Sequence, residues 1–219
     1  MCKLSAHLTT ATAAVALAIV AAPARAQNFL QGSPDTVWYG NVRLEGAPAQ
    51  MFPHDGGPDR TGGAVRLGYG ITSNFDLEAK SAFFDGVTLL GGDGHVRLYD
   101  RRDTLATVTV GGHHAFVRDA LDSNALDLSA SLGHWFSPRL QVYAAAAYSF
   151  EKLSGLPESA DSTFSRWYVV PGVRVGVADR LDLLVEGGVG LNDNSPHYIT
   201  AGFAFNVPVS DRAATGRRR

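Results

Sequence analysis

Residues 167–191 alternate with a period of two between apolar positions and positions held by charged residues or glycine. One parity carries tryptophan, proline, valine and leucine, whereas the other carries arginine, tyrosine, aspartate, glutamate and glycine. The polar break at 178–180 divides the stretch into two halves of about ten residues, the length that a tilted strand needs to cross a bilayer. Because side chains alternate across a strand, the pattern predicts two membrane-length strands joined by a tight turn.

The N-terminus has the three parts of a secretory signal peptide. Lys3 gives a positive start, residues 11–22 form a short apolar run of small residues, and Ala24-Arg25-Ala26 is an A-x-A cleavage site. The apolar run is too short to span a membrane as a helix, and no later window approaches the required length. The sequence therefore predicts export and cleavage after residue 26.

Cleavage would leave an acidic chain without thiols. The only cysteine, Cys2, and two of the basic residues lie in the signal peptide, so Lys+Arg falls from 19 to 17 against 21 Asp+Glu, and the net charge moves from -2 to -4. This balance does not indicate a nucleic-acid partner. Without disulfides, a closed sheet in lipid would supply the stability, because every backbone donor and acceptor is paired around the ring.

The period-two pattern repeats along the mature chain and predicts ten strands. They are expected at about 37–45, 63–71, 75–83, 92–100, 106–113, 126–135, 140–150, 167–177, 181–191 and 198–207. The predicted connections alternate between long loops and turns of about three residues. The long loops are 46–62, 84–91, 117–124, 151–163 and 192–196, and the short turns are 72–74, 101–103, 137–139 and 178–180. This alternation is typical of an up-and-down antiparallel transmembrane β-barrel, an all-β fold.

Eight or twelve strands are also compatible with the sequence, since the alternation is weakest around 84–94. The expected organisation is a signal peptide (1–26), an unstructured periplasmic lead-in (27–36), an outer-membrane β-barrel (37–207) and a basic C-terminal tail (208–219).

Alternation alone does not say which face points outward, because a soluble barrel would bury the apolar parity and a membrane barrel would expose it. Two observations favour the membrane. The chain has only three lysines, fewer than a water-facing surface normally carries. Aromatic residues of the apolar parity also gather near both ends of the strands, as in the two interfacial girdles of membrane barrels. The expected girdle residues are Phe83, Phe150 and Trp167 at the loop end and Trp38, Tyr69, Phe75, Phe136 and Phe205 at the turn end.

From Val37 to Val207 the chain resembles the small outer-membrane β-barrel proteins of Gram-negative bacteria. The resemblance lies in the strand pattern and implies the same fold and location. Such barrels commonly end on an aromatic residue, whereas here Phe203 and Phe205 precede a tail that ends in Arg217-Arg218-Arg219. The partners that the resemblance implies are outer-membrane lipids and the barrel assembly machinery, with a monomeric barrel as the expected state.

The charged residues of the polar parity are predicted to point into the lumen. They are Arg43, Glu45, Arg66, Asp76, Glu78, Lys80, Arg97, Asp127, Arg166, Arg174, Asp182 and Glu186. A barrel of eight to ten strands is nearly filled by its own side chains, and an unpaired charge away from water is costly. We favour opposite charges that pair and plug the lumen over a path for small ions or solutes.

Histidines, serines and a glycine run offer weaker candidates. His113 and His114 are adjacent strand residues that point to opposite faces, and His54-Asp55 lies in a predicted loop with Asp59 nearby. Asp127 with Ser129, Ser131 and a histidine from a neighbouring strand is the only arrangement that suggests a hydrolase. The Gly91-Gly92-Asp93-Gly94 run resembles a phosphate loop, but no helix follows it. No catalytic residue, metal site or cofactor is predicted.

The sequence therefore favours an integral outer-membrane barrel with a structural, surface-interaction or narrow-pore role and no enzymatic activity. An outer-membrane hydrolase with a rim site and a soluble periplasmic carrier are the two alternatives. The carrier would require the apolar parity to point inward and line a cavity.

Overall fold

The computed structural model describes residues 33–54, 56–118, 122–154 and 163–209, and these residues form ten β-strands. The strands are β1 (Asn41–Phe52), β2 (Arg60–Gly70), β3 (Phe75–Phe84), β4 (Val87–Arg101), β5 (Thr104–Val117), β6 (Ser123–Ser137), β7 (Leu140–Leu153), β8 (Thr163–Ala178), β9 (Leu181–Gly190) and β10 (His197–Pro208). The predicted signal peptide, residues 27–32 of the lead-in and residues 210–219 of the tail lie outside the described residues.

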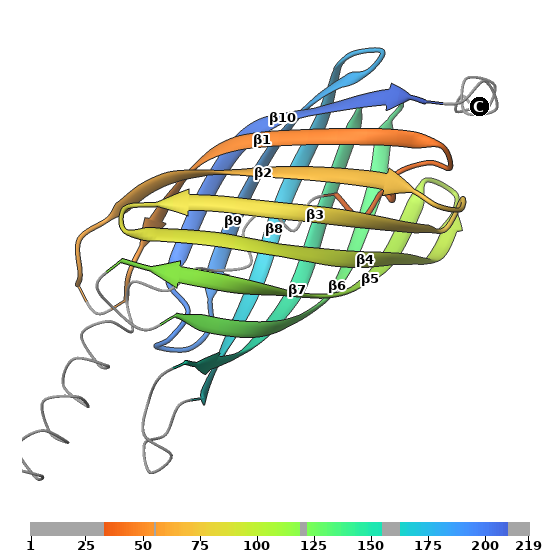
Figure 1. Ribbon diagram of the computed structural model, residues 1–219. Helices are drawn as coiled ribbons and strands as arrows, with labels where there is room; N and C mark the ends of the chain where they lie inside the picture. The colour runs from red at the N-terminus through yellow and green to blue at the C-terminus, as the bar shows by residue number, and fades with distance from the viewer. Residues whose placement is uncertain (1–32, 55, 119–121, 155–162, 210–219) are drawn as a thin grey trace, which may run out of the picture.

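Each strand pairs antiparallel with its neighbour in the sequence, and β1 pairs antiparallel with β10 to close the barrel (Figure 1). The closing pair runs from Asn41 opposite Pro208 to Phe52 opposite His197. The predicted ten-stranded up-and-down barrel is therefore confirmed. Among the described residues, no helix is long and apolar enough to cross a membrane.

The barrel has two different ends. At one end, which we call the turn end, the connections are short, and the described N-terminal segment and the end of β10 also lie there (Figure 1). Residues 71–74, 102–103, 138–139 and 179–180 make the connections of this end, close to the predicted positions. In one of these turns Arg102 and Asp103 both have positive φ angles, 50° and 65°. The opposite end, where β1 ends and β2 begins, is called the loop end.

Most strands extend further toward the loop end than the sequence predicts. Strand β1 runs through Pro48 to Phe52, although proline and glycine between 46 and 62 suggest a loop. Proline fits because the ladder between β1 and β10 is interrupted at Ala47 and Pro48. The predicted loop 84–91 is also wrong: β3 and β4 are joined by Asp85 and Gly86, and Gly86 takes a φ of 76° that only glycine adopts readily.

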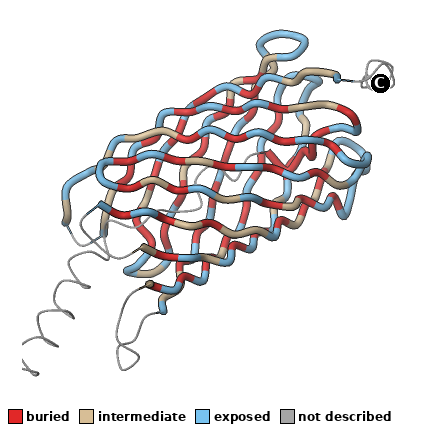
Figure 2. The backbone as a smooth tube through the Cα atoms, viewed as in Figure 1, coloured by how far each residue is buried: buried red, intermediate tan, exposed pale blue. Residues whose placement is uncertain are grey.

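Buried and exposed residues alternate along every strand, so the wall has two faces of opposite chemistry (Figure 2). The exposed face is apolar around the barrel; Leu67 on β2, Leu132 on β6 and Phe203 on β10 are each more than half exposed. Monomers in water rarely expose so continuous an apolar surface, whereas a lipid-facing wall requires one. The apolar parity therefore points outward, which excludes the soluble carrier.

Aromatic residues on this outer face gather at both ends, as predicted. Phe83 is 52% exposed and Trp167 50% exposed at the loop end, while Phe136 is 66% exposed and Tyr69 45% exposed at the turn end. Trp38 belongs to the same end, but it precedes β1 instead of lying within it, because the chain turns at Gly40 before the strand begins. The two girdles place the lipid along the length of the strands between them.

Candidate functional site

The structure places the twelve charged residues of the predicted lumen network inside the barrel, where none is more than 7% exposed. They face inward because they lie on the polar parity of their strands. All strands except β5, β7 and β10 contribute at least one of them. Their pairing partners decide whether the interior can be a path or a plug. Three groups of contacts follow the barrel axis, one at the centre, one toward the loop end and one at the turn end.

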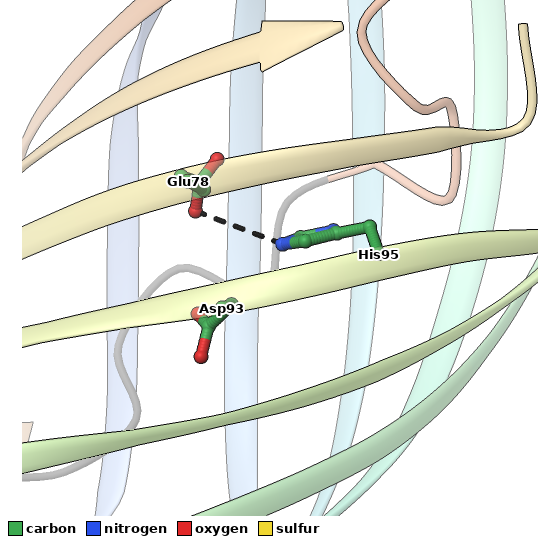
Figure 3. A group of neighbouring side chains, drawn as sticks. All are labelled: Glu78, Asp93 and His95. Atoms are coloured by element: carbon green, nitrogen blue, oxygen red, sulfur yellow. Dashed lines mark ion pairs between the residues drawn. The ribbon is translucent and has the colours of Figure 1, made fainter. Parts of the chain in front are cut away.

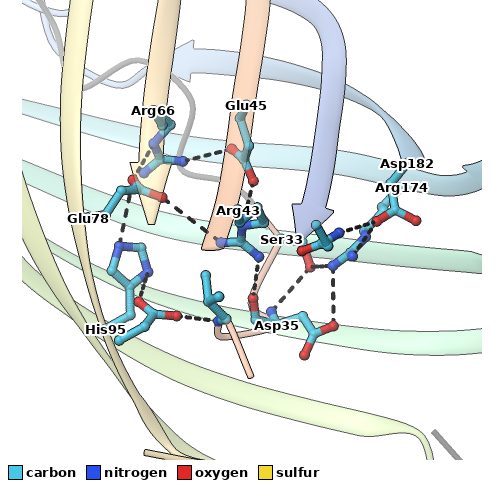
Figure 4. Close-up of polar contacts among 12 residues, drawn as sticks. Ser33, Asp35, Arg43, Glu45, Arg66, Glu78, His95, Arg174 and Asp182 are labelled. Carbon is cyan, nitrogen blue, oxygen red and sulfur yellow. Dashed lines mark hydrogen bonds and ion pairs between the residues drawn. The ribbon is translucent and has the colours of Figure 1, made fainter. Parts of the chain in front are cut away.

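Arg66 on β2 is the hub of the central group (Figure 4). Its Nε atom pairs with Glu78 on β3, its Nη1 atom lies 3.7 Å from Glu45 Oε2 on β1, and its Nη2 atom lies 3.8 Å from Asp93 Oδ2 on β4. Arg43 adds a second cation, with its Nε atom 2.9 Å from Glu45 Oε1. Four adjacent strands are thereby joined by alternating charges in the buried interior.

Lys80 extends this central group across the lumen. Its Nζ atom lies 2.8 Å from Asp93 Oδ1 and 2.9 Å from Asp127 Oδ2, so one ammonium bridges β4 and β6. Asp127 also lies 2.7 Å from His113 Nδ1 and accepts a 2.7 Å hydrogen bond from Ser149. A side chain at Gly111 would overlap Asp93, since a Cβ atom there would lie 1.8 Å from Asp93 Oδ1. The small residue on β5 makes room for the buried carboxylate.

Toward the loop end, Arg166 on β8 pairs with Glu151 on β7 at 3.2 Å. Ser123 donates a hydrogen bond of 3.3 Å to Glu151, and both residues have 0% exposure. Nearer the middle of the barrel, Glu186 on β9 accepts a 2.8 Å hydrogen bond from the Tyr143 hydroxyl on β7. A cluster of buried apolar and aromatic side chains accompanies these polar contacts. It consists of Ala47, Ala49, Met51, Ala64, Ala82, Phe84, Val87, Leu89, Ala115, Val117, Ala145, Ala147, Tyr168, Val170 and Tyr198.

At the turn end, the strand charges meet the N-terminal segment 33–37. Arg174 lies 2.5 Å from Asp182 and 3.2 Å from Asp35, and Arg97 lies 3.1 Å from Asp35. The prediction of an unstructured lead-in is therefore wrong for residues 33–36, which are buried inside the barrel. A short polar segment without alternation carries no sequence signal of its own, so its burial could not be predicted.

The predicted network also lacks several residues that the structure includes. Asp93, His95, His113 and Glu151 are buried and contact the predicted charges. Several of them lie at or beyond the ends of the strands that the sequence predicts. Extension of the period-two pattern of β4, β5 and β7 through these ends places their side chains inward.

Glu78, Asp93 and His95 form a compact group whose potential ligand atoms all lie within 4.8 Å of one another (Figure 3). His95 Nε2 lies 3.9 Å from Glu78 Oε1. A metal ion at this position would compete with cations that are already present, because Glu78 and Asp93 pair with Arg66, and Asp93 also pairs with Lys80. The geometry therefore fits a charge network better than a metal centre.

The arrangement that suggests a hydrolase is assembled only in part. His113 on β5 does contact Asp127, but the nearby hydroxyl is that of Ser149, which donates to Asp127 and not to the histidine. Ser131 instead donates to the Thr107 carbonyl oxygen at 3.4 Å. The side chain of His113 has 0% exposure, so a substrate at the rim does not reach the imidazole.

The other histidine candidates lie apart from this group. His114 points to the outer face, opposite to His113 as predicted, and contacts Asn124 at 2.9 Å. His54 lies beside His197 at the loop end, with ring centroids 4.2 Å apart and ring planes inclined by 60°. Asp55 lies outside the described residues, and Gly91-Gly92-Asp93-Gly94 is the middle of β4 and not a loop.

No protein-family model and no curated protein matches this sequence. Among solved structures, a de novo designed transmembrane β-barrel is similar at 15% identity and a TM-score of 0.40, over 77% of this chain and 97% of that chain. The N-terminal β-barrel domain of Pseudomonas aeruginosa OprF is similar at 16% identity and a TM-score of 0.35, over 77% and 98%. Neisserial surface protein A is similar at 14% identity and a TM-score of 0.35, over 77% and 96%.

These scores are too low to carry a role from those proteins to this one. The fold conclusion rests on this chain's own geometry, a closed antiparallel sheet with charges inside and an apolar wall with two aromatic girdles outside. That geometry confirms the prediction of a small ten-stranded transmembrane β-barrel of the outer-membrane type.

Proposed function

We propose that the protein is a closed outer-membrane barrel with a structural or surface-interaction role, whose lumen does not conduct ions in its resting state. The observation that carries this proposal is the continuous set of ion pairs from Arg43 through Glu45, Arg66 and Asp93 to Lys80. A conducting path needs charges that face water, whereas these face one another.

The energetics of buried charges support a plug over a pore. A buried ion pair is retained only where partners surround each charge, and removal of one partner leaves an uncompensated charge. Lys80 has two carboxylates within 3 Å, and Asp127 receives contacts from Lys80, His113 and Ser149. An ion that moved along the axis would have to separate several of these pairs at once.

The barrel would act as an anchor that presents its loop end to the outside of the cell. In this proposal, signal peptide 1–26 directs export and is removed, the assembly machinery inserts the barrel as a monomer, and lipids contact its apolar wall. No enzymatic step is proposed, because the His113–Asp127 pair, the feature that resembles part of a hydrolase site, is enclosed in the lumen.

Conductance in planar bilayers tests the proposal. Mature protein refolded and inserted into a bilayer in potassium chloride should give no steady conductance steps. Lys80→Ala and Arg66→Ala, which remove two cations that bridge strands, should introduce unstable openings. Leu67→Ala, on the outer face of the strand that carries Arg66, is the matched control and should remain silent.

Regular conductance steps from the unmodified barrel would contradict a closed lumen. If lumen substitutions also changed the ion selectivity of those steps while Leu67→Ala did not, the narrow-pore role would replace the structural one.

A further inference from the structure

Residues 33–37 are buried at the turn end of the barrel although they belong to no strand, and Figure 4 shows Ser33 and Asp35 among side chains of the wall. Ser33 is 4% exposed, Asp35 6%, and Thr36 and Val37 2% each. A polar segment that is merely a linker would stay in water, where its backbone groups are satisfied. Its burial inside the barrel requires specific partners in the wall.

Asp35 contacts three arginines from three different strands. Arg97 Nη2 on β4 lies 3.1 Å from one carboxylate oxygen, and Arg174 Nη1 on β8 lies 3.2 Å from the other. Arg43 on β1 donates a 2.8 Å hydrogen bond to the Asp35 carbonyl oxygen. Two guanidinium groups thus hold the two oxygens of one carboxylate, a charge-assisted arrangement in which arginine commonly binds carboxylate ligands.

The three arginines are oriented by acids of the barrel itself. Arg43 contacts Glu45 at 2.9 Å, Arg97 contacts Asp100 at 2.7 Å, and Arg174 contacts Asp182 at 2.5 Å. The arginine positions therefore do not depend on Asp35 alone. The carboxylate of Asp35 is the acid of this cluster that enters from outside the sheet.

The wall is also shaped to the segment. A Cβ atom on Gly133 would lie 2.6 Å from Pro34 Cγ, so the glycine of β6 leaves room for the proline ring. Thr107 donates a hydrogen bond to the Pro34 carbonyl oxygen, and Ser33 donates one of 2.5 Å to Gln141. Complementary shape and complementary charge occur at the same place.

We propose that Arg97 and Arg174 form a carboxylate-binding site in the turn-end lumen, and that the chain occupies this site with its own Asp35 while Arg43 holds the backbone of the same residue. Residues 33–37 then act as a tethered plug. When the plug leaves, the same arginines take a small carboxylate anion. The closed lumen described above and this site are separate claims, because the ion pairs of Arg66 and Lys80 are with Glu45, Glu78, Asp93 and Asp127 and not with Asp35.

Thiol labelling tests the plug directly, since removal of the signal peptide leaves no cysteine in the mature chain. Thr107→Cys would place a thiol beside Pro34. It removes one hydrogen bond to the segment but leaves the contacts of Asp35 with Arg97 and Arg174, so the plug should still protect the thiol from a negatively charged methanethiosulfonate reagent. With Asp35→Ala added, labelling should be about a hundredfold to a thousandfold faster, the range expected when a buried ion-pair partner is lost.

Two further cysteines fix the location of any opening. Ser137→Cys at the exposed turn end should react at one rate with or without Asp35. Ser123→Cys, buried at the loop end, should stay protected in both backgrounds. Faster labelling at Ser123→Cys as well would indicate general unfolding and would overturn the plug. If Asp35→Ala does not fold, as judged by the loss of a heat-dependent gel shift, Asp35→Asn replaces it in the same series.

Free acetate distinguishes a site that binds carboxylate from a segment that only blocks access to the lumen by its volume. Added to the Asp35→Ala, Thr107→Cys protein, acetate should restore protection in a saturable manner, whereas chloride at the same ionic strength should not. Three results would overturn the proposal: labelling of Thr107→Cys at the exposed rate while Asp35 is present, no acceleration without Asp35, or equal protection by acetate and chloride. None of these three results depends on whether the barrel conducts ions, so they test the plug separately from the proposed closed lumen.

Discussion

The two faces of the barrel wall are built from the same ten strands but stabilised by opposite means. On β5, His113 points inward with 0% side-chain exposure and lies 2.7 Å from Asp127, whereas its neighbour His114 is 34% exposed on the outer face. On the outer face, apolar side chains need no specific partner because lipid surrounds them. Inside, each charge needs a partner at close distance, because burial removes its hydration.

The effect of a substitution on stability therefore depends on the face of the wall on which it lies and not on its chemistry alone. A charge is tolerated inside where a counter-charge meets it and is costly outside at any mid-strand position. An apolar residue is tolerated outside and is costly inside wherever it removes a shared partner. Substitutions at neighbouring positions of one strand can therefore test the comparison.

Lys80→Met should have the largest effect. It removes the ammonium shared by Asp93 and Asp127, leaving two buried carboxylates with fewer partners. We expect the free energy of unfolding to fall by about 3–5 kcal/mol, the cost of breaking a buried ion pair from one side. Urea titration of the barrel in lipid vesicles, followed by the heat-dependent gel shift, measures the change.

Lys80→Arg keeps the charge and should recover most of this loss. Lys152→Met removes a lysine from an exposed position near the loop end and is the matched control, with an expected change close to zero. Equal losses for Lys80→Met and Lys152→Met would show that the central ion pairs contribute nothing to stability.

Leu67→Arg should have the second largest effect. Leu67 is 52% exposed on the outer face of β2, directly after the buried Arg66. An arginine near the middle of the lipid-facing wall is expected to cost about 2–4 kcal/mol of unfolding free energy in vesicles. The same urea titration checks this, with Leu67→Met as the apolar control. A stability unchanged by the arginine would mean that position 67 faces water.

The adjacent histidines give the smallest and most local test. His113→Ala should cost about 1–3 kcal/mol, because Asp127 loses a buried partner. His114→Ala should cost less than about 1 kcal/mol, since its contact with Asp122 at 3.8 Å is partly exposed. Both variants are compared by urea titration under identical conditions. A larger loss at 114 than at 113 would reverse the assignment of faces on β5.

The sequence predicts the two faces well because one physical rule, alternation with a period of two, acts along every strand. Asp127 and Arg174 are placed inside for that reason alone. The strand ends are harder to predict. Pro48 looks like a strand breaker in the sequence, because nothing there reveals the gap in the β1–β10 ladder that accepts a residue without a backbone donor.

The partners within the lumen could not be predicted from alternation. Which acid meets Lys80 depends on the stagger of strands β3 to β6, and no single strand encodes it. Asp35 escapes prediction for a related reason, since its segment has no period and is held by arginines on strands that lie far along the chain.

Fluorescence quenching of Trp167 by lipids with brominated acyl chains tests the orientation of the wall most directly. With Trp38 and Trp135 replaced by phenylalanine, Trp167 is the sole tryptophan of the chain, and it is 50% exposed on the outer face at the loop end. The account predicts strong quenching by the brominated lipids and weak quenching by aqueous acrylamide. Strong quenching by acrylamide without quenching by the lipids would place the apolar face in water and contradict a membrane barrel.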